Sequence, residues 1–323
     1  MTPKPTPEFD LIARYFTKPT PGAVLGVGDD CALLSIKPGH VLALSTDTLL
    51  SGVHFFPATD PSNLGHKALA VNLSDLAAMG ATPRWFTLAL TLPEINHAWL
   101  QAFSTGLLTL AAESAIELVG GDTTRGSLCM TLTVMGEIPQ GKALRRDAAI
   151  VGDDIWVSGT LGDAALGLRC IQGRVALTQA QRADAVARLE RPTARVELGL
   201  RLRDLASSAI DISDGLLADL GHICIRSRLG ARIEYKCVPM SSALREQDAA
   251  VITECVLAGG DDYELCFSAP QTARAALAVI AGDLGLALTR IGTLLDADGV
   301  TVIGENGQPL ALTHTGYDHF APT

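Results

Sequence analysis

The stretch that decides the fold covers residues 67–81 and reads KALAVNLSDLAAMGA. Its apolar residues lie on one face of a helix, and Gly80 interrupts the pattern. Pro61 opens the same segment, and proline is favoured in the first turn of a helix. We therefore predict a helix over residues 61–79. Asp75 lies within this apolar run and directly follows a serine.

Short acidic segments of this kind recur along the chain, each with Gly, Ser or Thr beside Asp. They are residues 26–30, 45–48, 72–75, 120–123, 211–215 and 259–262. Most follow or interrupt an apolar stretch, which predicts turns that place their carboxylates at strand ends or helix starts. Carboxylates that gather in one place repel each other, so a converging set requires hard divalent cations such as Mg²⁺. The alternative, that Asp and Gly simply suit surface turns, stays open for any single segment.

Length and composition narrow the class of protein. A chain of 323 residues suggests two domains, and 48% hydrophobic with 19% charged residues predicts well-filled cores. The net charge of −10 argues against binding to nucleic acid or anionic lipid, which requires a basic surface. No apolar run reaches the ~18 residues that span a bilayer, and the first residues do not resemble a signal peptide. We therefore expect a cytoplasmic protein without nucleic-acid or membrane partners.

Periodicity predicts alternating strands and helices. Strands are predicted at residues 41–46, 86–92, 117–119, 128–134, 155–158, 209–212, 264–267 and 300–303. Helices are predicted at residues 8–16, 61–79, 94–115, 178–190, 193–207, 215–229 and 271–282. The stretch 138–154 lacks periodicity and holds Pro139, Gly141 and Gly152. It marks a boundary between one domain at 1–140 and a second at 150–323.

Several common catalytic sites are absent from the sequence. Residues 136–143 nearly match a P-loop but end in Ala where a hydroxyl should hold Mg²⁺. Residues 26–31 lack the third Gly of a dinucleotide-binding fingerprint, and no G-x-S-x-G occurs. The seven Cys stand singly among apolar residues, which indicates reduced core thiols and argues against zinc.

The remaining chemistry comes from Asp, hydroxyls, glycine amides and a few Arg. That inventory fits phosphoryl transfer, where catalysis is mostly positioning and charge neutralisation. A phosphate acceptor is already largely ionised at pH 7 and needs no general base. No residue is therefore expected to act as a covalent nucleophile.

At these motifs the chain resembles the thiamine-monophosphate kinase family over essentially its whole length. The matching segments are residues 11–16, 28–32, 45–49, 67–81, 120–126, 211–216 and 316–318. The resemblance implies a two-domain α+β fold of the aminoimidazole ribonucleotide synthetase-like type and a homodimer joined through the N-terminal domains. It implies ATP- and Mg²⁺-dependent phosphorylation of thiamine monophosphate to thiamine diphosphate. Because no residue is placed as a nucleophile, we expect the phosphoryl group to pass directly from ATP to the substrate.

The resemblance also assigns roles to individual residues. The implied metal ligands are Asp30, Ser45, Thr46, Asp47, Asp75, Asp122, Asp211 and Asp214. The implied ATP contacts are Gly121, Asp122, Arg146 and Ser213. The implied contacts to thiamine phosphate are His54, Asp261 and Tyr317. Family members often have Glu in place of Asp261, which is one methylene shorter.

Three alternatives stay open. His54 and Tyr317 could be packed structural residues, and the need for K⁺ is undetermined. A sister ATP-dependent enzyme with another acceptor is one rival; a reactive N-terminal Cys would favour it, but Cys31 is predicted to be buried. A non-catalytic thiamine-phosphate or nucleotide sensor is the other rival, although no position of the ligand set is visibly lost.

Overall fold

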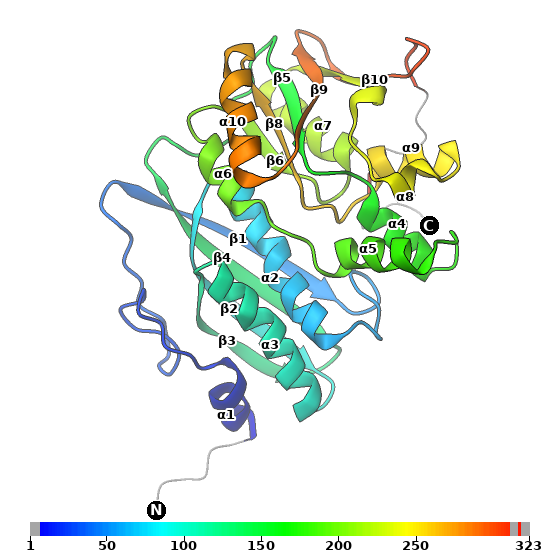
Figure 1. The fold of residues 1–323 in the computed structure, drawn as a ribbon. Coiled ribbons are helices and arrows are strands. Elements are labelled where there is room, and N and C mark those ends of the chain that lie inside the picture. Colours follow the sequence, from blue (N-terminus) through cyan, green and yellow to red (C-terminus); the bar gives the residue numbers. More distant parts are fainter. Residues whose placement is uncertain (1–6, 311–315, 318–323) are drawn as a thin grey trace, which may run out of the picture. The chain divides into compact units, whose positions relative to one another are not determined.

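The computed structural model describes residues 7–310 together with 316 and 317 (Figure 1). These residues divide into two compact units. The first runs up to Leu76 and resumes over Ala81–Gly141, and the second contains Ala77–Gly80 and the chain from Lys142 onward. The division after Gly141 lies within the aperiodic stretch 138–154. Part of the aromatic tail, residues 318–320, lies outside the described residues.

Helix α2 (Pro61–Ala78) begins and ends where its sequence dictates. The Asp60 carboxylate accepts the N–H groups of Ser62 and Asn63 at 2.9 and 3.1 Å, which caps the helix before its first-turn proline. At the other end Gly80 adopts φ 65°, a left-handed conformation that glycine tolerates. Its N–H bonds Ala77 O and the next N–H bonds Leu76 O, which is a Schellman motif.

The first unit contains one four-stranded sheet. Its strands are β1 (His40–Leu50), β2 (Thr82–Leu92), β3 (Glu117–Arg125) and β4 (Cys129–Pro139), in the order β1-β4-β2-β3. β4 pairs antiparallel with both β1 and β2, and β2 pairs parallel with β3. Strands β1 and β3 are therefore the two edges of this sheet.

Helices α2 and α3 (His97–Glu113) lie side by side on one face of this sheet (Figure 1). They approach so closely that a Cβ on Gly106 would meet the Ser62 carbonyl at 1.9 Å. On the opposite face, buried Trp85 packs with Val119 and Met135 against residues 23–34 of the N-terminal segment. That segment follows α1 (Pro7–Leu11) and a short π-helix at Ile12–Phe16.

The second unit contains a six-stranded mixed sheet in the order β10-β7-β9-β5-β8-β6. The strands are β5 (Asp154–Ser158), β6 (Ser208–Asp211), β7 (Gly230–Glu234), β8 (Leu265–Ala269), β9 (Leu288–Leu295) and β10 (Gly299–Ile303). The helices are α4 (Asp163–Ile171), α5 (Gln179–Glu190), α6 (Val196–Leu202), α7 (Leu216–Ser227), α8 (Ser242–Arg245), α9 (Ala249–Ala258) and α10 (Arg274–Leu284). Two 3₁₀ turns lie at Tyr235–Cys237 and Gln271–Ala273.

This sheet is buried on both faces. Along β5, Ile155 and Val157 belong to the core cluster that includes α7 and α9, while Trp156 packs into the cluster that includes α6 and α10. The alternation follows from the two-residue period of a strand. A strand buried on both faces becomes apolar throughout, which explains why 155–158 could be predicted.

Most predicted elements are present, with corrections at their ends. The helix predicted at 193–207 is confined to α6, and the structure adds β7, α8, α9 and β9, which the sequence reading missed. The prediction that Cys31 is buried is wrong, because its side chain is exposed. Among the described residues, no helix combines the length and apolar character needed to cross a bilayer.

Candidate active site

In the first unit, three predicted metal ligands come together at the face of the sheet that carries α2. The Ser45 hydroxyl donates to Asp75 Oδ2 at 2.6 Å, joining β1 to the helix. The Asp47 N–H donates to the amide oxygen of Asn72 at 3.2 Å. The Asn72 side chain is itself fixed, because its amide nitrogen donates to Ala68 O at 2.9 Å. These contacts hold β1 and α2 in one register, with oxygen ligands from both.

Two other predicted ligands lie on the opposite face of the same sheet. Thr46 alternates with its neighbours on β1, and its hydroxyl bonds that of Thr133 at 2.9 Å. Asp122 pairs with Ala89, and Ala89 pairs with Thr131. These three residues lie on the same face of the sheet as Thr46. Strands β4 and β2 separate β1 from β3, so Asp47 and Asp122 are about 14 Å apart across the sheet. A single copy of this unit cannot bring both carboxylates to one small cation.

The prediction that these acids occupy turns is wrong for Asp47 and Asp122, whereas Asp75 lies inside the helix predicted over residues 61–79. Asp47 lies inside β1 and Asp122 inside β3. The Gly120–Gly121 pair does not end β3, because it continues the parallel pairing with Thr87 and Leu88. Gly121 is needed there, since a Cβ on it would meet Leu88 O at 1.9 Å. The glycines serve close strand packing rather than a turn.

Asp30 and His54 occupy irregular segments of the first unit. Asp30 lies in an exposed bend, and its N–H donates to Asp29 Oδ1 at 2.8 Å. His54 lies in the turn after β1, where its Nδ1 accepts the Leu50 N–H at 3.0 Å. A neutral ring that accepts at Nδ1 carries its proton on Nε2. His54 can therefore donate a hydrogen bond through Nε2.

In the second unit, Asp211 ends β6, and the turn between β6 and α7 carries Ser213 and Asp214. One buried carboxylate oxygen, Oδ2 of Asp219, accepts the N–H groups of Ser213, Asp214 and Gly215 at 3.0 to 3.1 Å. Burial, followed by the charge of Asp214, raises the pKa of Asp219 to about 7 despite these hydrogen bonds. Asp219 therefore fixes the backbone from which the predicted ligands extend.

Two further segments bind this turn through their backbones. The Asp261 N–H donates to Ser213 O at 2.9 Å, and the Tyr317 N–H donates to Asp214 O at 3.0 Å. The Tyr263 hydroxyl donates to Asp261 Oδ1 at 3.2 Å. Five predicted site residues of this unit, from three separate segments, therefore lie around one turn.

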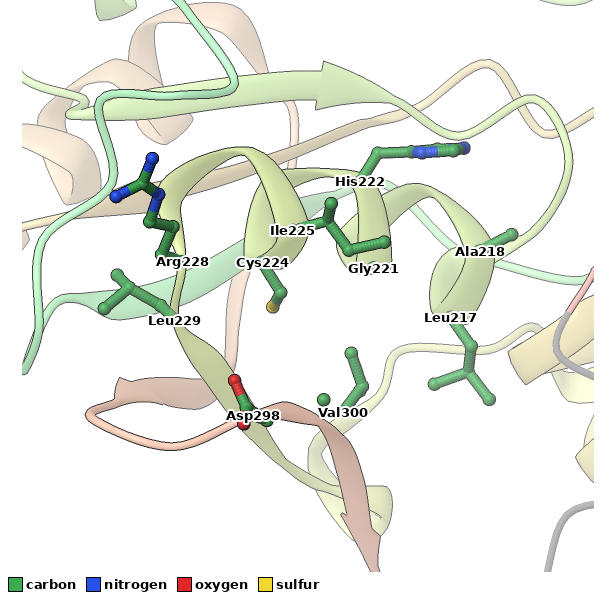
Figure 2. A pocket seen from close by; sticks show the side chains of 11 residues that line it. Leu217, Ala218, Gly221, His222, Cys224, Ile225, Arg228, Leu229, Asp298 and Val300 are labelled. Atoms are coloured by element: carbon green, nitrogen blue, oxygen red, sulfur yellow. The ribbon is translucent and has the colours of Figure 1, made fainter.

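Arg146 lies in the connection that leads into β5. The Ser227 hydroxyl at the end of α7 donates to its carbonyl at 2.7 Å, and its side chain is exposed. Nearby, α7 and β10 line a pocket of about 720 Å³ (Figure 2). Its lining is mainly apolar and also includes His222, Arg228 and Asp298. None of the predicted site residues lines this pocket, so we do not assign it to the reaction.

The two units match two family models. Residues 28–138 match the N-terminal domain of AIR synthase related proteins, and residues 151–305 match their C-terminal domain. Over 320 residues, 97% of this chain and 98% of the relative, the chain is 51% identical to thiamine-monophosphate kinase of Escherichia coli (strain K12). The chain belongs to the thiamine-monophosphate kinase family. A thiamine-monophosphate kinase of Haemophilus influenzae is 42% identical, with the same coverage of both chains.

Solved structures of the thiamine-monophosphate kinase family agree with this fold. The enzyme from Stenotrophomonas maltophilia K279a superposes with a TM-score of 0.85 at 50% identity, covering 94% of this chain and 96% of that chain. The complex of AaThiL with AMPPCP and TMP gives 0.78 at 30% identity, covering 88% and 89%. HypE of E. coli, at 23% identity, shares the fold with a TM-score of 0.79.

The donor set of this thiamine-monophosphate kinase family member suits magnesium by its chemistry. Carboxylates and hydroxyls are the oxygen ligands that Mg²⁺ prefers, and Mg²⁺ keeps several waters or substrate oxygens in its coordination shell. Within residues 7–310 and 316–317, no three His, Cys, Asp or Glu side chains gather as a metal-binding group. The ligand assignments therefore stay a prediction, and such ions would need substrate or second-copy oxygens as well.

Sequence reasoning missed the residues that support the site. Asn72 and Asp219 do not enter the implied ligand set, yet they hold Asp47 and the turn at 213–215. Asp219 could have been noticed, because a carboxylate in the first turn of a helix often accepts backbone N–H groups. The buried carboxylates of Asp262 and Glu264 were also missed. The arginine partners of Glu264, Arg188 and Arg195, are distant in sequence and give no local signal.

Proposed function

We propose that this protein transfers the γ-phosphoryl group of ATP to the phosphate of thiamine monophosphate, forming thiamine diphosphate and ADP. The observation that carries the proposal is family membership over nearly the full chain, at 51% identity to a thiamine-monophosphate kinase. The complex of AaThiL with AMPPCP and TMP supports ATP and thiamine monophosphate as the substrates. The oxygen-rich clusters of both units support the same reaction class.

The carboxylates and hydroxyls of the two units are proposed to hold several Mg²⁺ ions. The proposed ligands are Asp30, Ser45, Thr46, Asp47, Asp75 and Asp122 in the first unit, and Asp211 and Asp214 in the second. Bound Mg²⁺ neutralises phosphate charge, which allows a triphosphate and an anionic acceptor to approach. The residues 1–140 are proposed as the metal-binding, ATP-binding and dimerisation domain, and 150–323 as the domain that completes the ATP and substrate site.

Substrate contacts are proposed for a second set of residues. Gly121, Asp122, Arg146 and Ser213 are proposed to bind ATP. His54, Asp261 and Tyr317 are proposed to bind thiamine phosphate. The Nε2–H of His54 suits a phosphate oxygen, and an aromatic ring such as that of Tyr317 attracts the thiazolium cation by ~0.5–2 kcal/mol. Tyr317 is 55% exposed, so its ring is accessible to a ligand.

A homodimer is proposed because strand β1 presents apolar side chains to solvent. Val41, Leu42, Leu44 and Leu50 of β1 are all more than a third exposed, as is Val24 of the preceding segment. Exposed apolar surface of this kind marks interaction sites. A second copy would also explain the separation of Asp122 from Asp47 and Asp75, if each site takes Asp122 from the other copy. The two sites of a two-fold dimer would then be equivalent.

Transfer is proposed to be direct and in line, without a phosphoenzyme. Asp side chains that bind Mg²⁺ are poor nucleophiles, and the acceptor phosphate needs alignment more than activation. A single displacement inverts configuration at phosphorus, whereas a covalent intermediate restores it. ATP made chiral at its γ-phosphorus should therefore give inverted thiamine diphosphate, and net retention would contradict direct transfer.

The central test is a coupled assay with ATP, Mg²⁺ and thiamine monophosphate, in which thiamine diphosphate and ADP are measured together. We expect equal amounts of both products and a complete stop with EDTA. ATP consumption without thiamine diphosphate would favour a sister enzyme with another acceptor, and binding without turnover would favour a sensor. The same assay with and without K⁺ determines whether K⁺ is required. A cytoplasmic reaction is proposed, since ATP is the phosphoryl donor and all seven cysteines are free thiols.

A further inference from the structure

The segment between α9 and β8 has a strained backbone. Asp261 and Tyr263 adopt φ values of 68° and 50°, the left-handed region that side chains other than Gly rarely adopt. Such conformations persist only where the surrounding structure fixes them, and they gather at functional sites. Asp261 is also the proposed contact to thiamine phosphate. The contacts that fix this segment therefore bear directly on the substrate site.

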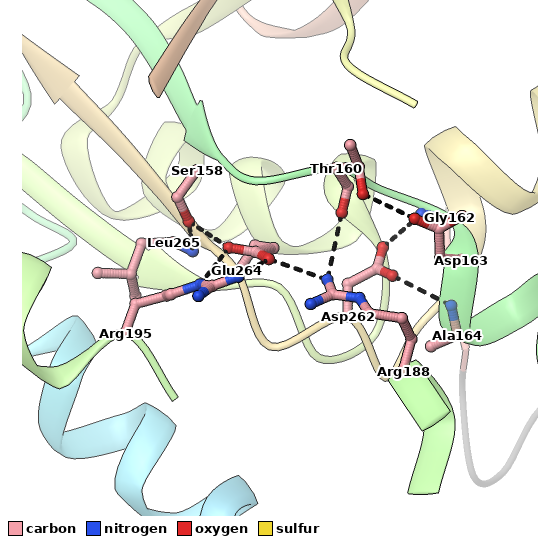
Figure 3. A network of polar contacts seen from close by, with 10 residues as sticks. All are labelled: Ser158, Thr160, Gly162, Asp163, Ala164, Arg188, Arg195, Asp262, Glu264 and Leu265. Carbon is pink, nitrogen blue, oxygen red and sulfur yellow. Dashed lines mark hydrogen bonds and ion pairs between the residues drawn. The ribbon is translucent and has the colours of Figure 1, made fainter. Parts of the chain in front are cut away.

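Side chains alternate along the strained segment. Asp261 and Tyr263 are partly exposed, whereas Asp262 and Glu264 are buried, with 2% and 0% of their surface accessible. Figure 3 shows both buried carboxylates pointing into a polar network formed with β5, α4 and α5. The two buried side chains therefore anchor the segment that carries the two partly exposed ones.

Glu264 is the centre of this network. The Arg195 guanidinium makes two bonds to its carboxylate, one of them from Nε to Oε2 at 2.7 Å, and Arg188 donates to Oε1 at 2.9 Å. The Ser158 hydroxyl donates to Oε2 at 2.6 Å. Burial by itself would raise the pKa of Glu264, but the hydrogen bonds and charges of Arg195 and Arg188 outweigh burial and hold the pKa below its ordinary value. The buried carboxylate is therefore ionised and paired with two cations.

A glycine lies directly against this carboxylate. A Cβ on Gly159 would lie 2.3 Å from Glu264 Oε1, so the glycine is what opens the space. Two residues before Glu264, Asp262 accepts the Gly162 N–H at 2.7 Å, at the start of α4. The Ile212 N–H donates to Glu264 O at 2.8 Å, which binds the end of the segment to β6. The segment is therefore fixed at both buried side chains and along its backbone.

We propose that Glu264 is a positioning residue for the thiamine-phosphate subsite, with Arg195 and Arg188 as its partners. It acts by holding the 260–263 backbone so that the Asp261 side chain faces the site. The proposal rests on the proposed function for its kinetic consequence, but its structural consequence can be measured independently. Both arginines are engaged by Glu264.

Asp154 offers a matched control in the same unit. It is also a fully buried carboxylate held by two arginines, Arg274 at 2.6 and 2.8 Å and Arg290 at 3.5 Å. It lies at the start of β5, whereas Ser158, the Glu264 partner, lies at its end. Removing either carboxylate charge leaves two arginines without their acid and should lower stability. The loss should be larger at Glu264, because its arginines are 25% and 17% exposed, against 46% and 48% for those of Asp154. Of the two changes, only the one at Glu264 should affect the 260–263 backbone.

The experiment compares Glu264→Gln with Asp154→Asn, and adds Arg195→Lys as a milder change that keeps the charge but loses the two-pronged contact. For Glu264→Gln and Arg195→Lys we expect the KM for thiamine monophosphate to rise about tenfold, with a smaller change in kcat and in the KM for ATP. Asp154→Asn should keep the wild-type KM and lose less thermal stability than Glu264→Gln.

Amide hydrogen exchange of the purified chain supplies the readout that does not need activity. The Asp261 and Tyr263 amides, bonded to Ser213 O and Ile212 O, should exchange faster in Glu264→Gln and Arg195→Lys but not in Asp154→Asn. If exchange at 260–263 is equal in all three variants, the positioning role is overturned. If the wild-type protein makes no thiamine diphosphate but the two variants still exchange faster, the proposed function is overturned and the structural role stands. Should Glu264→Gln fail to fold, Arg195→Lys decides the question by itself.

Discussion

Apart from Asp30, the proposed carboxylate ligands of the first unit lie inside regular elements, whereas those of the second unit lie at a strand end or in a turn. Ser45 and Asp47 belong to β1 and Asp75 to α2, so hydrogen bonds of a strand and a helix fix their backbones. Asp211, Asp214 and Asp261 lie at or beyond the end of β6 and in a segment with left-handed residues. The second unit replaces regular hydrogen bonding with buried acids, Asp219 and Glu264, that bind backbone N–H groups and arginines.

The two units therefore hold their ligand residues rigid by different kinds of contact. A helix or strand holds a ligand side chain through backbone hydrogen bonds that many sequences can supply. Replacing that side chain therefore changes the charge of the site more than its shape. A turn holds a ligand through a few specific contacts, so a single change alters geometry. Charge removal in the first unit should therefore reduce chemistry at constant stability. Backbone changes in the second unit should reduce stability and substrate binding together.

The largest effect is expected for Asp47→Asn and Asp75→Asn, which keep shape but remove charge. A metal ligand contributes several kcal/mol to the transition state, so kcat/KM should fall about a hundredfold or more. The melting temperature without ligand should stay equal or rise, because like charges repel each other in the cluster. Asp283→Asn, an exposed surface carboxylate, is the control for both assays. Near-normal turnover at high Mg²⁺ in both variants would contradict a shared metal site.

Next in size is the recovery expected when two inactive variants are mixed. If each site combines Asp47 of one copy with Asp122 of the other, a heterodimer of Asp47→Asn and Asp122→Asn has one intact site. Random re-association gives half heterodimers, so activity should return to about a quarter of wild type. The mixture of Asp47→Asn with Asp75→Asn is the control and should stay inactive, since both residues lie on one face of one unit. Equal recovery in both mixtures, or in neither, would show that Asp122 is not exchanged.

A smaller effect is expected for glycines of the second unit. Gly215 adopts φ 125°, and a Cβ on it would lie 2.8 Å from the Ala258 backbone, so Gly215→Ala should lower the free energy of unfolding by ~1–3 kcal/mol. It should also raise the KM for thiamine monophosphate. Gly221→Ala lies in the same region of the chain, inside α7 with open space around it, and should gain ~0.5–1 kcal/mol. Urea unfolding measures both, and equal shifts in the two variants would contradict the geometry.

The smallest effect concerns the pH dependence contributed by Asp262. Burial raises its pKa from 3.8 to about 8, despite the hydrogen bond from Gly162 and the charge of Arg188. The folded protein then binds more protons than the unfolded chain between these values, so the stability contributed by this group is lost as pH rises from about 4 to about 8. Asp262→Asn has no such titration. The melting temperature of wild type minus that of Asp262→Asn should therefore fall from pH 5 to pH 8. The corresponding difference between wild type and Gly221→Ala should stay constant over the same range.

Local signals in the sequence explain which elements could be predicted. Pro61 marks the start of α2 because a helix start tolerates a missing N–H. Gly80 marks its end because a helix end tolerates a left-handed residue. Strand β9, which the sequence did not predict, contains Gly292, and an isolated glycine weakens the pattern of a strand. In the structure Gly292 allows close pairing, since a Cβ on it would meet Arg232 O at 2.1 Å. The same ambiguity made Gly120 and Gly121 look like a turn.

The sequence by itself determined the element types, the family and the chemical inventory of oxygen ligands, since periodicity, capping residues and motif order are local properties of the chain. The tertiary structure decided which of these ligands lie together. Ser45 and Thr46 are neighbours in sequence, but the two-residue period of a strand places them on opposite faces of the sheet. Asp261 and Asp214 are distant in sequence, yet strand pairing of β8 with β6 brings their turns into contact. Register and strand order depend on contacts between distant residues, and no local pattern records them.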